Sequence, residues 1–378
     1  MKIGIEAQRL FRYKKHGMEI VTLELIKEIQ NLDKENQYVV FVKDDVDDTC
    51  INETENFKIR KLKKSPYPIW EQFLLPKAAE EENLDVLHCT SNTAPLFLKI
   101  PLILTLHDII YLESLNFKGS IYQNFGNIYR RLVVPYALKK SKIVITVSEF
   151  ERKRIVDQTQ IEGRKIKSIY NAKSKSFTIV DDQNRMLAVQ KRYNLPDKFI
   201  LFFGNTAPKK NTRRVIEGYT MYANSSSNIL PLVITDCKES YIHSILSDMN
   251  QALLTNNIIV KDYISFKDLP EVYNLAELFL YPSLRESFGL PIIESMACGT
   301  PVITSNASSM PEVAGNAAIL INPINSKEIG NAIKILLSDR AYYKSIVKMG
   351  IERASHFDWK VSAKKVIKIY HETKLNIN

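Results

Sequence analysis

Short runs rich in β-branched and aromatic residues alternate with amphipathic segments along almost the whole chain, and this alternation restricts its fold more than any other feature. The pattern is typical of parallel sheets covered by helices on both faces, because consecutive parallel strands are joined through a crossover helix. In the first half, strands are expected at residues 2–6, 38–42, 57–61, 86–89, 102–106, 143–147 and 166–169. Helices are expected near residues 18–30, 69–82, 121–138 and 149–157.

The alternation restarts after a polar stretch at residues 173–184. Further strands are expected at residues 199–203, 232–235, 258–261, 278–281, 301–304 and 317–321, with helices such as 211–223 and 241–254. Two such α/β units predict two doubly wound, Rossmann-like domains that face each other across a cleft, with ligands at the carboxyl ends of the strands. We place these domains at residues 1–172 and 173–358. The apolar spacing in 359–374 predicts a last helix that covers a surface, and residues 359–378 are assigned to the first domain.

The composition is that of an ordinary globular protein, with 378 residues of which 45% are hydrophobic and 25% charged. A charge at Glu6 interrupts what would be the apolar core of a signal peptide, and no apolar run approaches the roughly 20 residues that span a bilayer. The four cysteines are spaced for neither a zinc site nor a disulfide framework. A soluble, unprocessed protein of the reducing cytoplasm is therefore expected.

The glycines and histidines weaken several common enzyme classes. The 12 glycines form neither the dinucleotide fingerprint G-x-G-x-x-G nor a P-loop, and the six histidines form no H-E-x-x-H pair. Classical NAD enzymes, P-loop NTPases and the commonest zinc hydrolases lose their main sequence support.

The net charge of +10 is concentrated in one stretch, because residues 130–175 carry thirteen basic side chains against four acidic ones. A second basic cluster at residues 58–64 leads directly into the aromatic segment Pro66-Tyr67-Pro68-Ile69-Trp70. Each basic side chain near an anionic leaflet is worth about 1 kcal/mol, so five or more could hold an enzyme at a membrane. A solvated surface explains the same charges. Both interpretations stay open at this point.

The densest chemical signal lies at residues 282–303, where the expected strand 278–281 ends in a loop that contains Glu286 and Gly289. Pro291 suits the first turn of a helix, and Gly299 stops that helix. Backbone N–H groups at such a helix start form an anion site, and a glycine lets a ligand approach the backbone closely. Glu294, expected in the first helical turn, could accept the two hydroxyls of a ribose, and Glu286 could bind a sugar. Helix-end charges that interact with the dipole are the structural alternative for both.

This stretch resembles the Glu-x7-Glu signature of the retaining glycosyltransferases of family 4, also called glycosyl transferases group 1, which have the GT-B fold. The resemblance extends along nearly the whole chain. It implies an acceptor-binding first domain and a nucleotide-sugar-binding second domain. It also implies that Glu286, Gly289, Leu290 and Glu294 bind the donor.

A second matching segment, residues 201–211, is similar to the family's strand-turn-helix whose lysine binds the donor diphosphate. By this match Lys210 is the phosphate ligand, with Asn205 and Lys209 beside it. Asn205 stands where relatives carry an arginine, and Lys209 where many carry one, so charge is supplied here without a bidentate guanidinium.

In the first half, His107 follows an apolar strand and resembles the family's histidine that bonds the transferred sugar. Gly17 is similar to the glycine of the family's loop over the donor phosphate, although the usual Gly-Ile-Gly pattern is absent. Residues 308–313 look like the family's segment after the donor site. Ser148 and Asn171 also match, but capping of a helix by Ser148 and a turn at Asn171 explain them without chemistry.

The resemblance implies a retaining hexosyltransferase that needs neither a metal nor another cofactor, with His107, Glu286 and Lys210 as catalytic residues. The donor is expected to be a GDP- or UDP-linked sugar, and mannose from GDP-mannose is favoured. The acceptor is a saccharide or a lipid-linked saccharide of surface polysaccharide biosynthesis, and the basic, aromatic face is expected to hold the enzyme at the inner face of the cell membrane. The Asp-x-Asp within residues 44–48 is interpreted as a solvated loop rather than a metal motif.

Two other functions are weighed against transfer. A nucleotide-sugar epimerase can be built on the same fold, since fold does not fix function. A nucleic-acid-binding protein is permitted by the net charge, but the basic stretch contains no recognisable nucleic-acid-reading motif.

Overall fold

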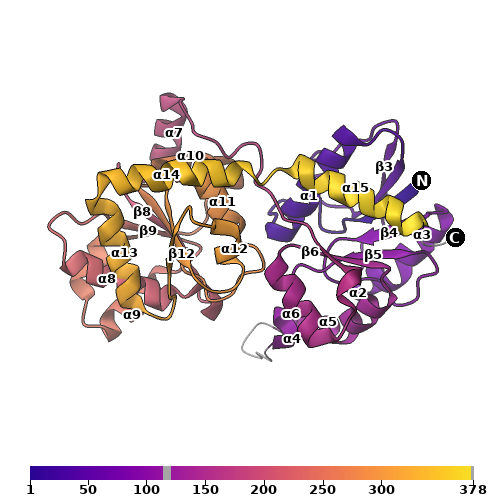
Figure 1. Ribbon diagram of the computed structural model, residues 1–378, viewed down its shortest axis with the longest axis horizontal. Coiled ribbons are helices and arrows are strands. Elements are labelled where there is room, and N and C mark those ends of the chain that lie inside the picture. Colours follow the sequence, from indigo (N-terminus) through magenta and orange to yellow (C-terminus); the bar gives the residue numbers. More distant parts are fainter. Residues whose placement is uncertain (114–120, 376–378) are drawn as a thin grey trace. The chain divides into compact units, whose positions relative to one another are not determined.

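The computed structural model describes residues 1–113 and 121–375. The chain divides into two compact units, the first made of Met1–Ala172 with the segment from Asp358 onward, the second of Lys173–Phe357 (Figure 1). Each unit contains one parallel sheet with helices on both faces, as the alternation in the sequence predicts.

The first unit is built on a seven-stranded sheet in the order β3-β2-β1-β4-β5-β6-β7, in which every strand pair is parallel. Its strands are β1 (Lys2–Glu6), β2 (Gln37–Lys43), β3 (Phe57–Leu62), β4 (Val86–Cys89), β5 (Leu102–Thr105), β6 (Ile143–Thr146) and β7 (Ile166–Ser168). The central strands β1, β4, β5 and β6 are buried along nearly their whole length. Burial on both faces explains why they read as uninterrupted apolar runs.

The helices of the first unit are α1 (Gly17–Leu32), α2 (Tyr67–Ile69), α3 (Leu75–Glu81), α4 (Ile110–Glu113), α5 (Ile121–Lys140), α6 (Glu149–Thr159) and α15 (Trp359–Leu375). The last of these packs beside α1, although more than 300 residues separate them in the sequence (Figure 1). Val366, Ile369 and Tyr370 of α15 belong to the same buried cluster as Ile3 and Ile5 of β1. Helix α15 is therefore an integral part of the first unit.

The second unit is built on a six-stranded parallel sheet in the order β10-β9-β8-β11-β12-β13. Its strands are β8 (Ile200–Phe203), β9 (Leu232–Thr235), β10 (Ile258–Lys261), β11 (Leu278–Tyr281), β12 (Val302–Ser305) and β13 (Ile319–Ile321). Its helices are α7 (Gln183–Tyr193), α8 (Thr212–Asn224), α9 (Glu239–Asp248), α10 (Leu269–Leu275), α11 (Leu290–Ala297), α12 (Met310–Ala314), α13 (Ser326–Ser338) and α14 (Arg340–Ser355).

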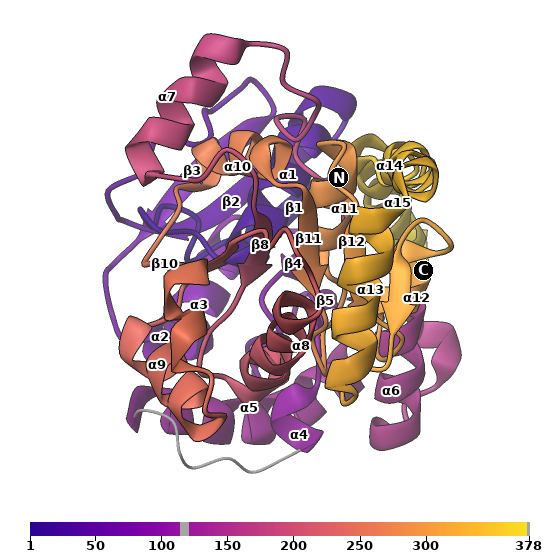
Figure 2. The same ribbon diagram turned by 90° about the vertical axis from the view of Figure 1, so that its left-hand side faces the viewer.

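Helices α8 and α13 lie side by side on one face of this sheet and pack through two glycines (Figure 2). A Cβ on Gly330 would stand 2.7 Å from the backbone oxygen of Gly218, and a Cβ on Gly218 would stand 2.6 Å from Ile329 Cβ. The two glycines thus allow a backbone approach that any side chain would prevent. This packing supports β8, whose carboxyl end carries the candidate site.

Every expected strand is present, but three helical segments differ from the prediction. Helix α7 begins at the end of the polar stretch 173–184 and covers residues for which no element is expected. Its N-cap Asp182 accepts a hydrogen bond from the Arg185 amide, and the helix buries only Val189. The helix expected at 69–82 contains a π-helical turn at Trp70–Leu74. The helix expected at 241–254 ends at Asp248, because Asn250 adopts a left-handed conformation with φ of 55°.

Gly330→Ala is expected to lower the free energy of unfolding of the second unit. Alanine is the better helix former by about 1 kcal/mol. Overpacking against a backbone oxygen that cannot rotate away costs typically about 1–3 kcal/mol, and we expect this cost to dominate. Chemical denaturation measures the change, with Lys334→Ala on the exposed face of the same helix as the control. A gain in stability for Gly330→Ala would contradict the close packing of α8 and α13.

Candidate functional site

The candidate site lies at the point where the strand order of the second sheet reverses. Strands β8 and β11 are neighbours, and the chain leaves them toward opposite edges of the sheet. Crossover helices on opposite faces leave a crevice at the carboxyl ends of such a strand pair, where ligands of open α/β sheets bind. The loop after β8 carries Lys209 and Lys210, and the loop after β11 carries Glu286 and Gly289. The structure thus brings together two loops whose site residues are separated by 76 or more positions in the sequence.

Asn211 ties these loops to each other. It has a left-handed backbone with φ of 61° and is 5% exposed. Its side-chain amide donates to the carbonyl oxygens of Pro282 at 3.0 Å and of Pro323 at 2.6 Å. The Leu284 amide also donates to the Lys209 carbonyl oxygen at 2.8 Å. Sequence reasoning did not assign this anchoring role, although an asparagine that directly precedes a helix is a signal for it.

Lys210 and Glu286 form the central ion pair of the site, with 2.8 Å between Nζ and Oε1. Their side chains are only 18% and 12% exposed. Lys210 Nζ also donates to the Tyr281 hydroxyl at 3.3 Å and lies 4.9 Å from the centre of that ring. The lysine is therefore held in place before any ligand arrives.

The pKa of Glu286 reflects competition between burial and charge. Burial alone would raise it, but the Lys210 and Lys209 ammonium groups and hydrogen bonds from Lys210 and Ser283 outweigh burial and leave the pKa below its usual value. Glu286 is therefore ionised at neutral pH.

Two serines hold the loop after β11. Ser308 Oγ donates to the Glu286 carbonyl oxygen at 2.6 Å and accepts from the Glu286 amide at 3.2 Å. Ser309 Oγ, fully buried, lies 2.9 Å from the carbonyl oxygens of both Glu286 and Phe288. These serines open the segment 308–313 that the sequence places after the donor site. Their contacts make it the support of the loop.

Gly289 and Leu290 form the start of α11. Gly289 has φ of 104°, a conformation that side-chain-bearing residues rarely adopt, and Leu290 is the first helical residue. The positive end of the helix dipole therefore points into the same loop that carries Glu286. A phosphate or a sugar hydroxyl can be bound at this place by backbone N–H groups.

The sequence predicts Glu294 in the first turn of α11, and this prediction is wrong, because the helix begins at Leu290 and Glu294 is its fifth residue. The side chain is nearly buried, with 6% exposure, and its Oε2 accepts a hydrogen bond from the Tyr273 hydroxyl at 3.4 Å. Burial raises the pKa of Glu294 to about 8. Without a ligand it is therefore mainly a neutral carboxylic acid at pH 7, which can both donate and accept hydrogen bonds.

Asn205 makes hydrogen bonds within its own loop and to the start of α8. Its Oδ1 accepts a hydrogen bond from the Ala207 amide at 2.8 Å, and its backbone bonds the Thr212 hydroxyl. Its side-chain carbonyl thus shapes the turn before Lys209, and only its amide nitrogen is left for a ligand. Lys209 is exposed, in contrast to Lys210.

His107 belongs to the first unit, where it follows β5 and is 5% exposed. Its backbone N–H donates to Asn92 Oδ1 at 2.6 Å. Its Nε2 lies 2.9 Å from the Thr90 carbonyl oxygen, which can only accept, so Nε2 carries the hydrogen and Nδ1 is an acceptor. Burial lowers the pKa of His107, which keeps the ring neutral.

Gly17 and Ser148 open helices of the first unit. Gly17 is the first residue of α1, and no described heavy atom lies within 4 Å of the place where its Cβ would be. The preceding His16 amide donates to Glu19 Oε2 at 3.0 Å in a capping box. Ser148 caps α6 by accepting from the Glu151 amide, as the structural interpretation predicts.

Within residues 1–113 and 121–375, no three His, Cys, Asp or Glu side chains converge as metal ligands would. In the acidic segment 44–48, Asp44 and Asp48 pair with Lys61 at 3.1 and 3.0 Å, and Asp47 pairs with Lys15. Three of the four carboxylates in this segment thus pair with lysines, and Asp45 accepts a hydrogen bond from the Val46 amide.

Comparison with known protein families shows to which family this fold and these motifs belong. The model of "Glycosyltransferase Family 4" matches residues 16–172, and that of "Glycosyl transferases group 1" matches residues 187–353. The chain belongs to this glycosyltransferase family. The two matches fall one in each structural unit, and the resemblance that the Glu-x7-Glu segment carries is confirmed.

Among curated proteins, this glycosyltransferase is 26% identical over 257 residues to the serotype-specific mannosyltransferase WbdA of Escherichia coli. That alignment covers 67% of the chain but only 31% of WbdA, so the chain spans about a third of the length of this relative. It is also 28% identical over 283 residues to the O-antigen chain mannosyltransferase RfbU of Salmonella typhimurium, where the alignment covers 75% of the chain and 73% of the relative.

Solved structures share the fold of this glycosyltransferase. The Anabaena HepE structure in complex with UDP and glucose matches with a TM-score of 0.76 at 18% identity, over 98% of this chain and all of HepE. WaaG, a glycosyltransferase involved in lipopolysaccharide biosynthesis, matches with a TM-score of 0.72 at 13% identity, over 97% of this chain and 99% of WaaG. The predicted GT-B fold of two Rossmann-like units is confirmed.

The buried Glu294 of this glycosyltransferase makes stability depend on pH. Its pKa is about 8 in the folded chain and near 4.5 when unfolded, so the folded state binds more protons between these values. Stability contributed by this group must then fall as pH rises from 4.5 to 8. We expect the wild type to lose stability relative to Glu294→Gln across this window, with a slope of at most about 1.4 kcal/mol per pH unit.

Chemical denaturation of both proteins at pH 5, 6.5 and 8, without nucleotide, measures this difference. Other titrating groups contribute equally to both proteins and cancel. Identical pH profiles would show that Glu294 is not held in a proton-binding, desolvated environment.

Proposed function

We propose that this glycosyltransferase moves a hexose, mannose in the first instance, from a GDP- or UDP-linked donor to a saccharide or lipid-linked saccharide of surface polysaccharide biosynthesis. The observation that carries the proposal is the buried Lys210–Glu286 pair beside the start of α11, at the strand-order reversal of the second sheet. The mannosyltransferase names of WbdA and RfbU support the choice of sugar.

The second unit supplies the groups that a nucleotide-sugar donor requires. In glycosyl transfer the leaving diphosphate gains negative charge while the sugar becomes oxocarbenium-like. Lys210, held 18% exposed, can neutralise that charge together with the N-terminus of α11. Glu286 can then bind sugar hydroxyls through its carboxylate, and Glu294 can bind the ribose hydroxyls.

In the first unit, His107 offers a neutral Nδ1 that can accept a hydrogen bond from a hydroxyl of the transferred sugar. Glu286 is engaged by Lys210, and we assign no protein group the role of nucleophile on the sugar. We therefore favour retention by front-face attack, in which the leaving phosphate takes the acceptor proton. The reaction is proposed to proceed without a metal, since the positive charge is already supplied by side chains and a helix end.

Lys210→Ala and Glu294→Ala are each expected to lower kcat/KM for transfer at least tenfold, which corresponds to about 1.4 kcal/mol of transition-state stabilisation. The donor is first found by thermal-shift screening against GDP, UDP, dTDP and CMP. Transfer is then measured as nucleotide release with and without EDTA, and Lys334→Ala on α13 is the control.

Near-normal kcat/KM in either variant would remove that residue from the donor site. Complete loss of turnover in EDTA would overturn the metal-independent mechanism. Conversion of the donor sugar without an acceptor would indicate an epimerase, and salt-sensitive binding of DNA or RNA with no sugar transfer would indicate a nucleic-acid-binding protein.

The first unit also has a surface that suits an anionic membrane. Helix α5 exposes large apolar side chains along one face, and basic residues at its C-terminal end flank them. The apolar members and their exposures are Phe125 (54%), Ile128 (47%), Leu132 (64%) and Tyr136 (67%). Lys139 and Lys140 lie in the last turn. Among the described residues, no helix is long and apolar enough to cross a membrane.

Two neighbouring segments extend this face. Gln72 donates to the Tyr129 hydroxyl of α5 at 2.7 Å and accepts from the Leu96 amide at 2.9 Å, so it joins α5 to the segments that carry Phe73 and Phe97. These two rings are 69% and 86% exposed. Exposed apolar side chains beside cations are typical of interfacial segments, and we propose peripheral binding at the cytoplasmic face of the cell membrane.

Leu132→Asp is expected to lower binding to vesicles that contain anionic lipid at least threefold in a sedimentation assay. It removes apolar contact and adds a negative charge at the face. Leu253→Asp, which changes a 93% exposed leucine of the second unit, is the matched control and should bind as the wild type does. Equal binding of both variants, or no preference for anionic over neutral vesicles, would refute membrane association through α5.

A further inference from the structure

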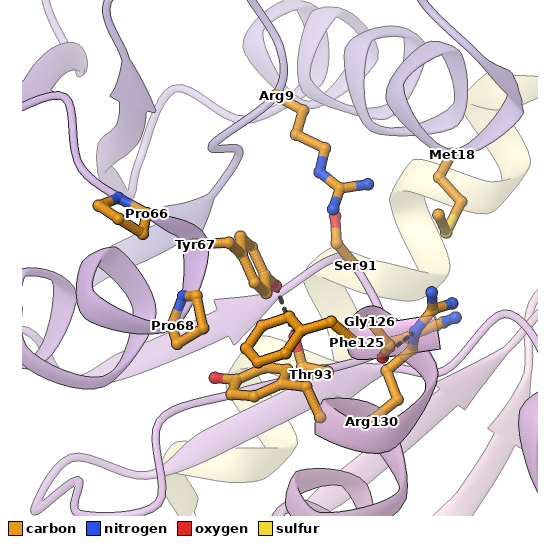
Figure 3. A pocket seen from close by; sticks show the side chains of 12 residues that line it. Arg9, Met18, Pro66, Tyr67, Pro68, Ser91, Thr93, Phe125, Gly126 and Arg130 are labelled. Atoms are coloured by element: carbon orange, nitrogen blue, oxygen red, sulfur yellow. Dashed lines mark hydrogen bonds between the residues drawn. The ribbon is translucent and has the colours of Figure 1, made fainter. Parts of the chain in front are cut away.

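A pocket of about 380 Å³ lies wholly within the first unit (Figure 3). Strand order in the first sheet reverses between β1 and β4, and the pocket is lined from the carboxyl ends of both: Arg9 follows β1, and Ser91, Asn92 and Thr93 follow β4. The segment after β3, helix α5 and Met18 of α1 complete it. Its volume is within the range of about 300–1,000 Å³ that is usual for small-molecule sites. It therefore has the position and the size of a ligand site.

The walls are aromatic. Tyr67 and Tyr129 line the pocket with their ring centres 5.9 Å apart and their planes at 80°. Phe125 is 54% exposed, and in Figure 3 its ring lies on the same side of the pocket as the Tyr67 ring. Flat apolar rings beside an open space provide a surface on which the C–H face of a sugar ring can pack.

A buried carboxylate fixes these aromatic walls from beneath. Glu71 is 0% exposed and lies in the π-helical turn Trp70–Leu74, an insertion of a kind that is frequent at functional sites. It accepts hydrogen bonds from the hydroxyls of Tyr67, at 2.7 Å, of Tyr129 and of Thr93. Both rings are thus oriented before a ligand binds, which lowers the entropy cost of binding.

Two guanidinium groups enter the pocket from opposite sides, Arg9 from above and Arg130 from below in the view of Figure 3. Arg9 Cζ lies 5.3 Å from the centre of the Tyr67 ring, and Arg9 is only loosely paired with Glu19, at 3.8 Å. Arg130 bonds the Gly126 carbonyl oxygen through Nε at 3.1 Å, which fixes the direction of its fork. Guanidinium groups arranged in this way suit a phosphate, whose oxygens accept paired hydrogen bonds.

We infer that this pocket binds a phosphorylated saccharide, with the phosphoryl group between Arg9 and Arg130 and the sugar ring against Tyr67 and Phe125. This inference rests on the proposed function, because the phosphorylated saccharide is taken to be the acceptor of the transfer reaction. That group belongs either to a lipid-linked saccharide, whose phosphate joins sugar and lipid, or to a soluble sugar phosphate. The donor site on the second sheet is a different set of residues.

Calorimetric titration of the full chain with mannose 1-phosphate as the probe tests the pocket directly. Arg9→Gln and Arg130→Gln are each expected to weaken binding at least tenfold, and unphosphorylated mannose should bind wild type at least tenfold more weakly than the probe. Arg213→Gln, which alters a half-exposed arginine of the second unit, is the matched control and should change nothing. Phe125→Ala should weaken binding of the probe but leave binding of inorganic phosphate unchanged, because the substitution removes only an aromatic ring against which the sugar packs.

Further measurements distinguish binding in this pocket from binding at the donor site, and test the inference independently of the proposed function. Probe binding should persist in saturating GDP or UDP and in Lys210→Ala; displacement by nucleotide, or loss in Lys210→Ala, would overturn the inference. Equal affinity of wild type, Arg9→Gln and Arg130→Gln would overturn it as well. Pocket binding that follows these expectations in a chain that transfers no sugar would refute the transferase proposal alone.

Transfer assays distinguish the two sources of the phosphate. With a prenyl-diphosphate-linked saccharide as the acceptor, Arg9→Gln and Arg130→Gln should raise the KM of the acceptor and leave the KM of the donor unchanged if the lipid-linked source is correct. Glycosylation of mannose 1-phosphate itself, with the same KM effects, would assign the soluble source. Donor KM values that rise instead would place both arginines at the donor and contradict the inference.

Discussion

The constraint on which the rest of the structure depends is the reversal of strand order in each parallel sheet. A chain that starts in the middle of a sheet and winds first to one edge and then to the other must place its crossover helices on opposite faces. Such a reversal leaves a crevice outside the carboxyl ends of the two central strands. In the first sheet these strands are β1 and β4, and in the second they are β8 and β11. The loops that follow them carry Arg9 in the first unit and Lys209, Lys210, Glu286 and Gly289 in the second.

The buried carboxylates of the two sites are of two kinds, according to whether a cation lies within contact distance. Glu286 has Lys210 at 2.8 Å and keeps its charge, so its pKa is lowered despite burial. Glu294 and Glu71 are bonded by hydroxyl groups, and burial raises the pKa of each. A hydroxyl orients a carboxyl group but does not offset the cost of burying its charge. Glu286 is therefore the ionised carboxylate of the donor site, whereas hydroxyl donors orient Glu294 in the second unit and Glu71 in the first.

How much of this could be predicted from the sequence depends on how local the signal is. The central strands are predictable because strands buried on both faces are continuous apolar runs. Lys210 and Glu286 each lie in a compact motif, and the structure brings these two side chains together. Helix α7 was missed because it buries one apolar residue, and the turn of Glu294 was misjudged because the sequence does not show that Gly289, with its left-handed backbone, precedes the first helical residue.

The pocket of the first unit shows the limit of such prediction. Arg9, Tyr67, Thr93 and Arg130 are spread over more than 120 residues and share no motif, and what unites them is the strand order of the sheet. Glu71 lies in a π-helical turn, which a search for a 3.6-residue period does not detect. The sequence did place cations and aromatics together at residues 58–70. We interpret that composition as a membrane contact. In the structure, the Tyr67 hydroxyl donates a hydrogen bond to the buried Glu71, whereas Phe73, three residues after the end of this segment, is exposed. One short segment can therefore serve both a ligand pocket and an exposed apolar face, because the turn separates the directions of its side chains.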